Sequence, residues 1–552
     1  MPKYSIGVDF GKISGRAVLV NIENGKIVAT SAVDYPRGIM VKTFKNGNPL
    51  PDDWALAYPQ DYLDILSETI RDVISNVNPA DVIGIGIDMS SCCVMPVKAN
   101  GTPLCYLDEF KDNPYAYASI TRNLSAKKQA KRMLDVAREM EEPWLKYYNG
   151  KISPEWLFPK ILKIIDEAPR VYSEADYFIE VVDWLIWQLT GSQIRNSFSA
   201  SFKGFYIPGI GYPSKKYLSA VNLKLGNIVD TKLNAPIFST GELAGNLTKH
   251  GSNLIGLPIG TSVSVGVVDL YACTATVKGV KNDAMVGIFG DSGTMFSFSD
   301  VTANIKGISG GFQLNSGSDM TVYKAKHNCI GRTYAWFLHN YVKPEYHQEA
   351  KEQNRNLYSY IAQKMMRLNA GENGLIALNW LDGNQAVLSN PELSSVIVGM
   401  REDTRVEHIL RAIVESMAYD TRKLIETYRE NGIQTKEFYG VGTFAEKNPF
   451  IMQVYSDVLQ IPIRVAGTPM SPAIGSAIYG AVAAGSVNGG YDTVREASEA
   501  MGCLKNVEYT PNPYNQEIYN QLYAEYCKIY DLFGKEYVDI MTNLKNIKQN
   551  AN

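Results

Sequence analysis

A strand–turn–strand pattern occurs twice in this chain, about 280 residues apart. In the first copy, the largely apolar residues 6–10, which include Asp9, run into a turn that contains Gly11, Ser14 and Gly15, and a second apolar strand follows. In the second copy, residues 286–289 lead into a turn that runs from Gly290 to Thr294, before another apolar strand. Self-similarity over this distance indicates a duplicated domain. Two related hairpins, one in each half of the chain, therefore constrain the fold.

The segments between the two hairpins alternate between strand and helix patterns. Residues 62–74 carry apolar side chains at helical spacing, and residues 82–87 predict a buried strand that ends at Asp88. Residues 261–268 predict another strand, which reaches Asp269 before a helix from about residue 270. This order indicates the α/β class. We expect an N-terminal domain over residues 1–278 and a C-terminal domain over 279–552, with a helical extension at its end.

Other helices and strands are predicted from the same patterns. Tryptophans and leucines before Thr190-Gly191 indicate a core helix that ends in a glycine cap. In the second half the chain predicts helices over 409–428, 447–458, 470–484 and 517–533, and a strand over 437–440. The helix over 470–484 is rich in small residues, and Gly475 and Gly480 allow it to pack closely.

Charge and composition argue against several classes of protein. The 552 residues carry a net charge of −3, which argues against a protein that binds nucleic acid or a membrane surface. Apolar runs stay below the roughly 18 residues that span a bilayer, and the N-terminus lacks the layout of a signal peptide. The seven cysteines are scattered without a Cys-x-x-Cys pair, so reduced thiols in a cytoplasmic protein fit best.

The second turn has two incompatible interpretations. Gly-Asp-Ser-Gly, which ends at Gly293, also surrounds the nucleophile of chymotrypsin-like proteases, but those enzymes need a histidine and an aspartate before the serine. Only His250 precedes Ser292, and its surroundings do not fit. Position 294 is threonine, so the Gly-x-Ser-x-Gly pattern of α/β-hydrolases also fails. A phosphate-binding turn is the better interpretation.

Glycine- and serine-rich turns between strands present backbone N–H groups to phosphate oxygens. A carboxylate at the end of the strand before such a turn, here Asp9, can hold Mg²⁺ or its waters. Asp269, after a later strand, can act as a base near the transferred group. A single aspartate at a strand end is more often a turn or capping residue. The interpretation as a phosphate site therefore rests on the turns and the two aspartates together, and not on any one of them.

The chain resembles the FGGY family of carbohydrate kinases, and within it the ribulokinase branch. The resemblance runs almost from end to end. In the first half it rests on Val8-Asp9-Phe10-Gly11, Ser14-Gly15-Arg16-Ala17, Gly86-Ile87-Asp88, Ser90-Ser91-Cys92, Asn113-Pro114-Tyr115-Ala116-Tyr117, Gly150-Lys151-Ile152-Ser153, Glu155-Trp156, Asp183-Trp184, Trp187-Gln188-Leu189-Thr190-Gly191, Arg195-Asn196-Ser197, Phe202-Lys203 and Gly266-Val267-Val268-Asp269. In the second half it rests on Ala377-Leu378-Asn379-Trp380, Asp382-Gly383-Asn384, Lys447-Asn448-Pro449 and Ser471-Pro472-Ala473-Ile474-Gly475.

The resemblance implies duplicated actin-like ATPase domains of the ribonuclease H-like type, with a cleft between them. It implies ATP-dependent phosphorylation of the primary hydroxyl of a ketopentose or a related sugar or polyol, with Asp269 as general base and Asp9 as the Mg²⁺ residue. Sugar contacts are implied for Ser91, Cys92, Lys203, Asp269 and Lys324. Contacts to ATP are implied for Gly11, Lys12, Ser14, Arg16, Gly290, Ser292, Gly293, Thr294, Gly442, Thr443, Asn448 and Gly475. A homodimer is also compatible with the family.

The chain departs from the family pattern at four places, one of which spans two residues. Lys12-Ile13 replaces a threonine and a following polar residue, and Asp291 puts a carboxylate beside the expected phosphates. Thr443 replaces the second glycine of a pair, and threonine does not adopt the positive φ that glycine can. Lys324 replaces a sugar-binding glutamate, which exchanges an acceptor for a donor. An active kinase is the leading hypothesis, and a catalytically weakened relative that binds sugar or nucleotide as a sensor is the alternative.

Overall fold

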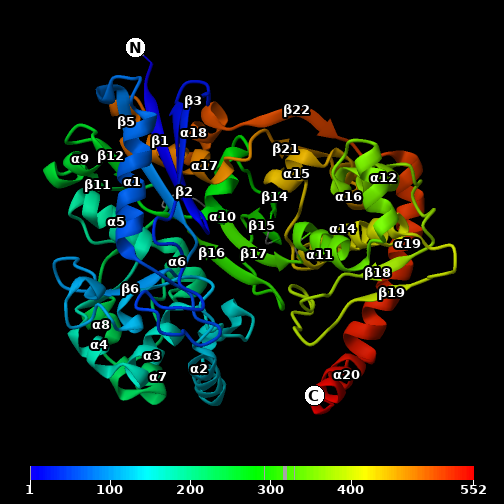
Figure 1. The fold of residues 1–552 in the computed structure, drawn as a ribbon, viewed down its shortest axis with the longest axis horizontal. Helices are drawn as coiled ribbons and strands as arrows, with labels where there is room; N and C mark the ends of the chain where they lie inside the picture. The colour runs from blue at the N-terminus through cyan, green and yellow to red at the C-terminus, as the bar shows by residue number, and fades with distance from the viewer. Residues whose placement is uncertain (1, 291–292, 315–319, 329, 552) are drawn as a thin grey trace. The chain divides into compact units, whose positions relative to one another are not determined.

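The computed structural model describes residues 2–290, 293–314, 320–328 and 330–551, and Figure 1 shows its ribbon. Contacts divide the chain into two compact units. Unit 1 comprises Met1–Val280, Gly310–Thr321 and Met470–Cys503, and unit 2 comprises Lys281–Ser309, Val322–Pro469 and Leu504–Asn552. The sequence-based division into domains over residues 1–278 and 279–552 stays a prediction. In the structure, residues 470–503 come from the second half of the chain but belong to unit 1.

The main sheet of unit 1 has the strand order β11-β12-β5-β1-β2-β3, and β13 also pairs with β5. The hairpin strands β1 and β2 are antiparallel, whereas β1 and β5 are parallel. The bounds are β1 Tyr4–Phe10, β2 Ser14–Asn21, β3 Ile27–Asp34, β5 Val82–Met89, β11 Leu243–Asn246, β12 Ser262–Ser264 and β13 Val267–Val268.

Unit 2 repeats this arrangement. Its sheet contains the order β17-β15-β14-β20-β21-β22; β14 and β15 form an antiparallel hairpin, and β14 runs parallel to β20. The bounds are β14 Ala284–Phe289, β15 Gly293–Ser299, β17 Thr321–His327, β20 Glu437–Val441, β21 Ile463–Ala466 and β22 Leu504–Tyr509. The equivalent order and direction of the strands confirm the duplication that the sequence predicts.

Helices and short strands surround the two sheets. In unit 1 they are β4 Leu56–Ala57, α1 Pro59–Val73, β6 Val94–Val97, β7 Ala118–Ser119, α2 Lys127–Glu139, α3 Leu157–Glu167, α4 Pro169–Glu174, β8 Tyr177–Glu180, α5 Val181–Thr190, β9 Arg195–Asn196, α6 Ser197–Lys203, α7 Lys215–Val221, α8 Ile228–Lys232, β10 Ile237–Phe238, α9 Lys249–Ile255, α10 Asp269–Ala272, α17 Ser471–Ala484 and α18 Val494–Met501. In unit 2 they are α11 Ile330–Tyr341, α12 Pro344–Glu352, α13 Leu357–Met366, β18 Ile376–Leu378, β19 Val396–Val398, α14 Val406–Glu430, α15 Thr443–Lys447, α16 Pro449–Leu459, α19 Pro513–Asp531 and α20 Asp539–Asn550. The strand β16 spans Ser309–Gln313. None of the helices in the described part of the chain is long and apolar enough to cross a membrane.

Side-chain alternation in β1 separates a core face from a face covered by α17. Ile6, Val8 and Phe10 belong to the apolar core that also contains residues of α1. Gly7 lies on the opposite face, since successive side chains of a strand alternate, and a Cβ there would be only 1.7 Å from the carbonyl oxygen of Ala473 in α17. Although α17 and β1 are far apart in the sequence, they lie side by side (Figure 1).

Small residues allow this close approach of helix and sheet. In β5, a Cβ on Gly86 would be 1.9 Å from the carbonyl oxygen of Ser476. Gly475, on α17 itself, lies against α10, where a Cβ would be 1.9 Å from the carbonyl oxygen of Ala272. The predicted close packing of the helix over 470–484 is thus confirmed, and the face that α17 covers leads along β1 and β5 to Asp9 and Asp88.

Candidate active site

Three carboxylates lie where neighbouring strands of unit 1 end. Asp9 and Asp88 are direct partners in the parallel pair β1 and β5. Val267 of β13 is opposite Asp88, and Asp269 follows β13 as the first residue of α10. The carboxyl ends of parallel strands in such sheets are where ligands bind, so the fold itself gathers the three aspartates at a position suited to chemistry.

Each aspartate has a different set of partners. The hydroxyl Oγ of Ser476 donates to Asp88 Oδ2 at 2.5 Å, and Arg16 Nε lies 3.5 Å from Asp9 Oδ2. Ser90 Oγ donates to Asp269 Oδ2 at 2.7 Å, and the backbone N–H of Leu270 donates to Asp269 Oδ1 at 2.7 Å. Asp269 is thus held through both of its oxygens and is only partly buried.

Burial controls the protonation of Asp9 and Asp88. It raises the pKa of Asp9 to about 6, against the opposing effects of a hydrogen bond with Asp88 and the charge of Arg16. Burial, together with the neighbouring charge of Asp9, raises the pKa of Asp88 well above its ordinary value. Both carboxyl groups are therefore harder to ionise than an exposed aspartate, because burial and the neighbouring negative charge disfavour their charged forms.

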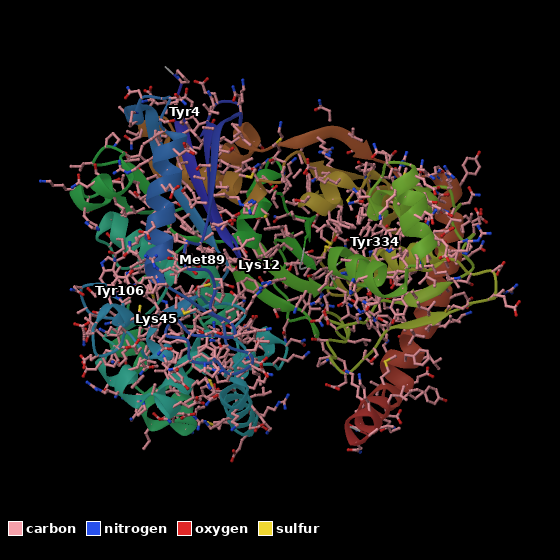
Figure 2. All side chains as sticks on the ribbon, viewed as in Figure 1. Tyr4, Lys12, Lys45, Met89, Tyr106 and Tyr334 are labelled. Carbon is pink, nitrogen blue, oxygen red and sulfur yellow. The ribbon has the colours of Figure 1, made fainter. Side chains whose placement is uncertain are left out.

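The first predicted phosphate turn joins β1 to β2 beside these carboxylates. The N–H of Gly11 donates to the carbonyl oxygen of Ser14 at 2.9 Å, and Tyr35 Oη donates to the carbonyl oxygen of Gly11 at 2.8 Å. Lys12 is exposed at the tip of the turn. Figure 2 labels Lys12 and Met89 at this edge of the sheet, and both line one pocket, in which Ser90 also takes part.

The second predicted phosphate turn lies in unit 2. Ser292 and Asp291 are outside the described residues. Gly293 begins β15, and a Cβ there would be 2.8 Å from the carbonyl oxygen of His327. Thr294 is buried and Gly290 is half-buried. Close backbone packing therefore requires a glycine at position 293.

The predicted nucleotide loop of unit 2 contains one glycine that the backbone requires. Gly442 has φ of 101°, and a Cβ there would lie 2.5 Å from the carbonyl oxygen of Phe289. Thr443 is the first residue of α15 and has a negative φ, so the backbone conflict expected at Thr443 does not arise. Asn448 accepts a hydrogen bond from Tyr358 Oη at 2.9 Å and donates to the carbonyl oxygen of Phe444 at 2.7 Å.

The predicted sugar contacts of unit 1 lie together. Ser91 and Cys92 are buried in the loop after β5, and Cys92 Sγ is 3.9 Å from the carbonyl oxygen of Lys203. Lys203 Nζ lies 3.3 Å from Glu155 Oε1. Although burial disfavours the ammonium, the charge of Glu155 raises the pKa of Lys203 above its ordinary value. The loop therefore faces a lysine that stays charged.

The candidate residues divide between the two units. Unit 1 holds Asp9, Gly11, Lys12, Ser14, Arg16, Ser91, Cys92, Lys203, Asp269 and Gly475. Unit 2 holds Gly290, Gly293, Thr294, Lys324, Gly442, Thr443 and Asn448. Lys324 is half-buried in β17.

Several residues of the site are not predicted from the sequence. Ser476 binds Asp88 although 388 positions separate them, and a serine after Gly475 carries no signal for that contact. Glu180 and Lys160 hold the backbone of Cys92. A buried glutamate at the end of an apolar strand, as at Glu180, is the one signal that pattern reading could have used.

Comparison with known families decides the assignment. Residues 4–275 match the N-terminal domain of the FGGY family of carbohydrate kinases, and residues 285–484 match its C-terminal domain. The chain belongs to the FGGY family of carbohydrate kinases. This kinase is 40% identical to the ribulokinase of Bacillus licheniformis over 97% of its own length and 98% of that protein, and 36% identical to the ribulokinase of Mycolicibacterium smegmatis over 100% and 97%.

Solved structures support the fold. The xylulose kinase of Rhodospirillum rubrum superposes with a TM-score of 0.77 at 18% identity, covering 96% of this kinase and 99% of that chain. The gluconate kinase of Lactobacillus acidophilus gives 0.78 at 17% identity, covering 98% and 100%. This kinase therefore has the two-domain actin-like ATPase fold, and its family membership makes it an enzyme that phosphorylates a sugar with ATP.

Proposed function

We propose that this kinase transfers the terminal phosphate of ATP to the primary hydroxyl of a ketopentose, in the manner of a ribulokinase. The relatives named ribulokinase support this substrate class, because they are similar to this chain over nearly its whole length. The single observation that carries the mechanism is the position of Asp269. It lies one residue beyond a strand that pairs with β5, beside Asp9 and Asp88, with its carboxylate fixed by two donors.

In this mechanism Asp269 accepts the proton of the sugar hydroxyl as that oxygen attacks phosphorus. The hydrogen bonds from Ser90 and from the N–H of Leu270 hold the carboxylate in one orientation. A base that is already oriented contributes to catalysis through geometry as well as through its proton affinity.

The sugar is bound by the loop that carries Ser91 and Cys92, and by Lys203. The ammonium of Lys203 supplies hydrogen-bond donors to sugar hydroxyls, and its ion pair with Glu155 keeps it in place. Lys324 remains a predicted sugar contact. Ribulokinases carry a glutamate at this position, which accepts hydrogen bonds, whereas the lysine donates them, so it favours a sugar that presents an acceptor oxygen there.

Asp9 fits the role of the Mg²⁺ residue. Asp9 is the last residue but one of β1, shortly before the Gly11 turn, and it is the strand partner of Asp88. Carboxylate oxygens are the ligands that Mg²⁺ prefers, and Mg²⁺ bound with ATP needs only one or two of them. When bound, the ion neutralises negative charge on the phosphates.

The test is ADP release from Mg²⁺–ATP across a panel of pentuloses, hexuloses and polyols. We expect turnover with a ketopentose, and a loss of about 10²–10⁴-fold in kcat for Asp269→Asn, because the amide cannot accept the proton. No ADP release with any sugar of the panel would contradict the proposed substrate class. Full activity of Asp269→Asn would contradict the assigned base.

A further inference from the structure

Cys92 has a backbone conformation that is rare for its residue type. Its φ is 61°, in the left-handed region that residues other than glycine, asparagine and aspartate seldom adopt. The residue is fully buried. It belongs to the loop between β5 and β6, between Ser90, which binds Asp269, and the strand that follows. An unfavourable conformation at this position persists only if its surroundings hold it there.

Two buried side chains of opposite charge hold the backbone of Cys92 from either side. The N–H of Cys92 donates to Glu180 Oε2 at 2.9 Å. Lys160 Nζ donates to the carbonyl oxygen of Cys92 at 2.7 Å. Glu180 is 2% exposed and Lys160 is 5% exposed, so water does not weaken either hydrogen bond. Hydrogen bonds that involve a charged group are among the strongest that proteins form.

Regular elements fix both of these side chains. Glu180 is the last residue of β8 and is paired with Val94 of β6, two positions after Cys92. Lys160 lies in α3 and also donates to the carbonyl oxygens of Ser119 and Ile120, at 3.0 and 2.9 Å. Three carbonyl acceptors satisfy its ammonium, which has three N–H donors. The side chains of Glu180 and Lys160 are therefore fixed in place, unlike mobile charged groups at a protein surface.

The conformation of Cys92 sets the direction of the loop that carries the proposed sugar contacts. Ser90 on one side is bonded to Asp269, and Cys92 Sγ approaches the carbonyl oxygen of Lys203 at 3.9 Å. A change of φ at Cys92 would move Ser91 relative to both Asp269 and Lys203. We propose that Glu180 and Lys160 are positioning residues that hold Cys92 in the left-handed conformation, and thereby shape the sugar-binding loop. The inference rests on the proposed function, because it assigns sugar binding to this loop.

The experiment is a double-mutant cycle between Glu180 and Cys92. Glu180→Met removes the acceptor and is introduced into two backgrounds, Cys92→Ala and Cys92→Gly. Both backgrounds lack the sulfur; they differ by one methyl group, and glycine adopts a positive φ without the cost that alanine meets. We expect Glu180→Met to raise the sugar KM about tenfold in the alanine background and less than about threefold in the glycine background. The KM for ATP should change little in either.

Glu180→Gln is the conservative control, because its side-chain carbonyl can still accept the N–H of Cys92; we expect its sugar KM to stay within about threefold of wild type. If Glu180→Met does not fold, the cycle is run with Lys160→Met, which removes the donor to the Cys92 carbonyl, with the same expectation. An equal loss in the alanine and glycine backgrounds would overturn the proposal. Turnover absent from the wild type as well would instead contradict the proposed function.

Discussion

The side chain of His327 makes the free energy of unfolding of unit 2 depend on pH. It is 7% exposed at the end of β17, its Nε2 lies 3.2 Å from Thr421 Oγ1, and burial lowers its pKa to about 4. An unfolded histidine titrates near 6.5. The unfolded chain therefore binds more protons between pH 6.5 and 4, so this contribution to stability is complete above pH 6.5 and is lost as the pH falls.

The prediction is that His327→Gln reduces the loss of stability in acid. Between pH 7 and pH 5 the free energy of unfolding of the wild type should fall by about 2 kcal/mol more than that of the variant. Urea unfolding at both pH values measures this, with the exposed His250→Gln as the control. Parallel losses in the wild type and in His327→Gln would show that His327 does not carry the effect.

At the residue scale, sequence patterns predict the carboxylates but not their environment. Asp9 lies near the end of an apolar strand and Asp269 directly follows one, and that pattern is local. The contact between Ser476 and Asp88 depends on how α17 packs on the sheet. The left-handed φ of Cys92 is likewise set by Glu180 and Lys160, which come from other elements. Apart from Glu180, whose place at the end of an apolar strand is a local signal, the residues that act through these tertiary contacts carry no local pattern.

At the element scale, periodicity predicts most elements but not where they break. The helix expected over 447–458 corresponds to α16, which begins only at Pro449, because that proline disfavours the helical conformation at the preceding Asn448. The strand expected over 261–268 is divided into β12 and β13 around Gly266, where a Cβ would lie 2.7 Å from Val182. Each of these two boundaries is set by a single residue, Pro449 or Gly266.

The two C-terminal helices differ in how much they stabilise unit 2. Tyr519 and Tyr526 of α19 are buried, and their hydroxyl groups bind Arg411 and Asp420 of α14. In α20, by contrast, Leu544 is 61% exposed. Burial of several tyrosines in α19 contributes far more than the partial burial of α20, since stabilisation follows the apolar area removed from water.

We therefore predict different outcomes for two truncations. A chain that ends after residue 538 lacks only α20 and should fold, with its melting temperature lowered by a few degrees at most, roughly the effect of losing about 1 kcal/mol. A chain that ends after residue 511 lacks α19 as well and should not give a folded unit 2. Circular dichroism and thermal melting distinguish the two. Cooperative unfolding of the shorter chain at the wild-type temperature would contradict the role given to α19.

At the scale of the whole molecule, the two duplicated units share the same sheet arrangement but carry different residues at the ends of the equivalent strands. The pairs Gly7–Gly86 in unit 1 and Gly287–Gly440 in unit 2 occupy the same places in their sheets. Two positions further along, β1 and β5 carry Asp9 and Asp88, whereas β14 ends in Phe289 and β20 is followed by Gly442. Only unit 1 of the described chain therefore presents carboxylates at this point.

This asymmetry predicts that nucleotide binding and proton transfer can be separated. Asp269→Asn leaves the glycine turns and Asp9 unchanged, so ATP should stabilise the variant as it stabilises the wild type, by about 2.7 kcal/mol at one hundred times the Kd. Thermal melting with and without Mg²⁺–ATP measures this, and Mg²⁺ alone is the control. The same preparation should show the loss of kcat expected for a missing base. If Asp269→Asn loses the stabilisation by ATP together with turnover, Asp269 contributes to nucleotide binding, and the division of roles between base and nucleotide site fails.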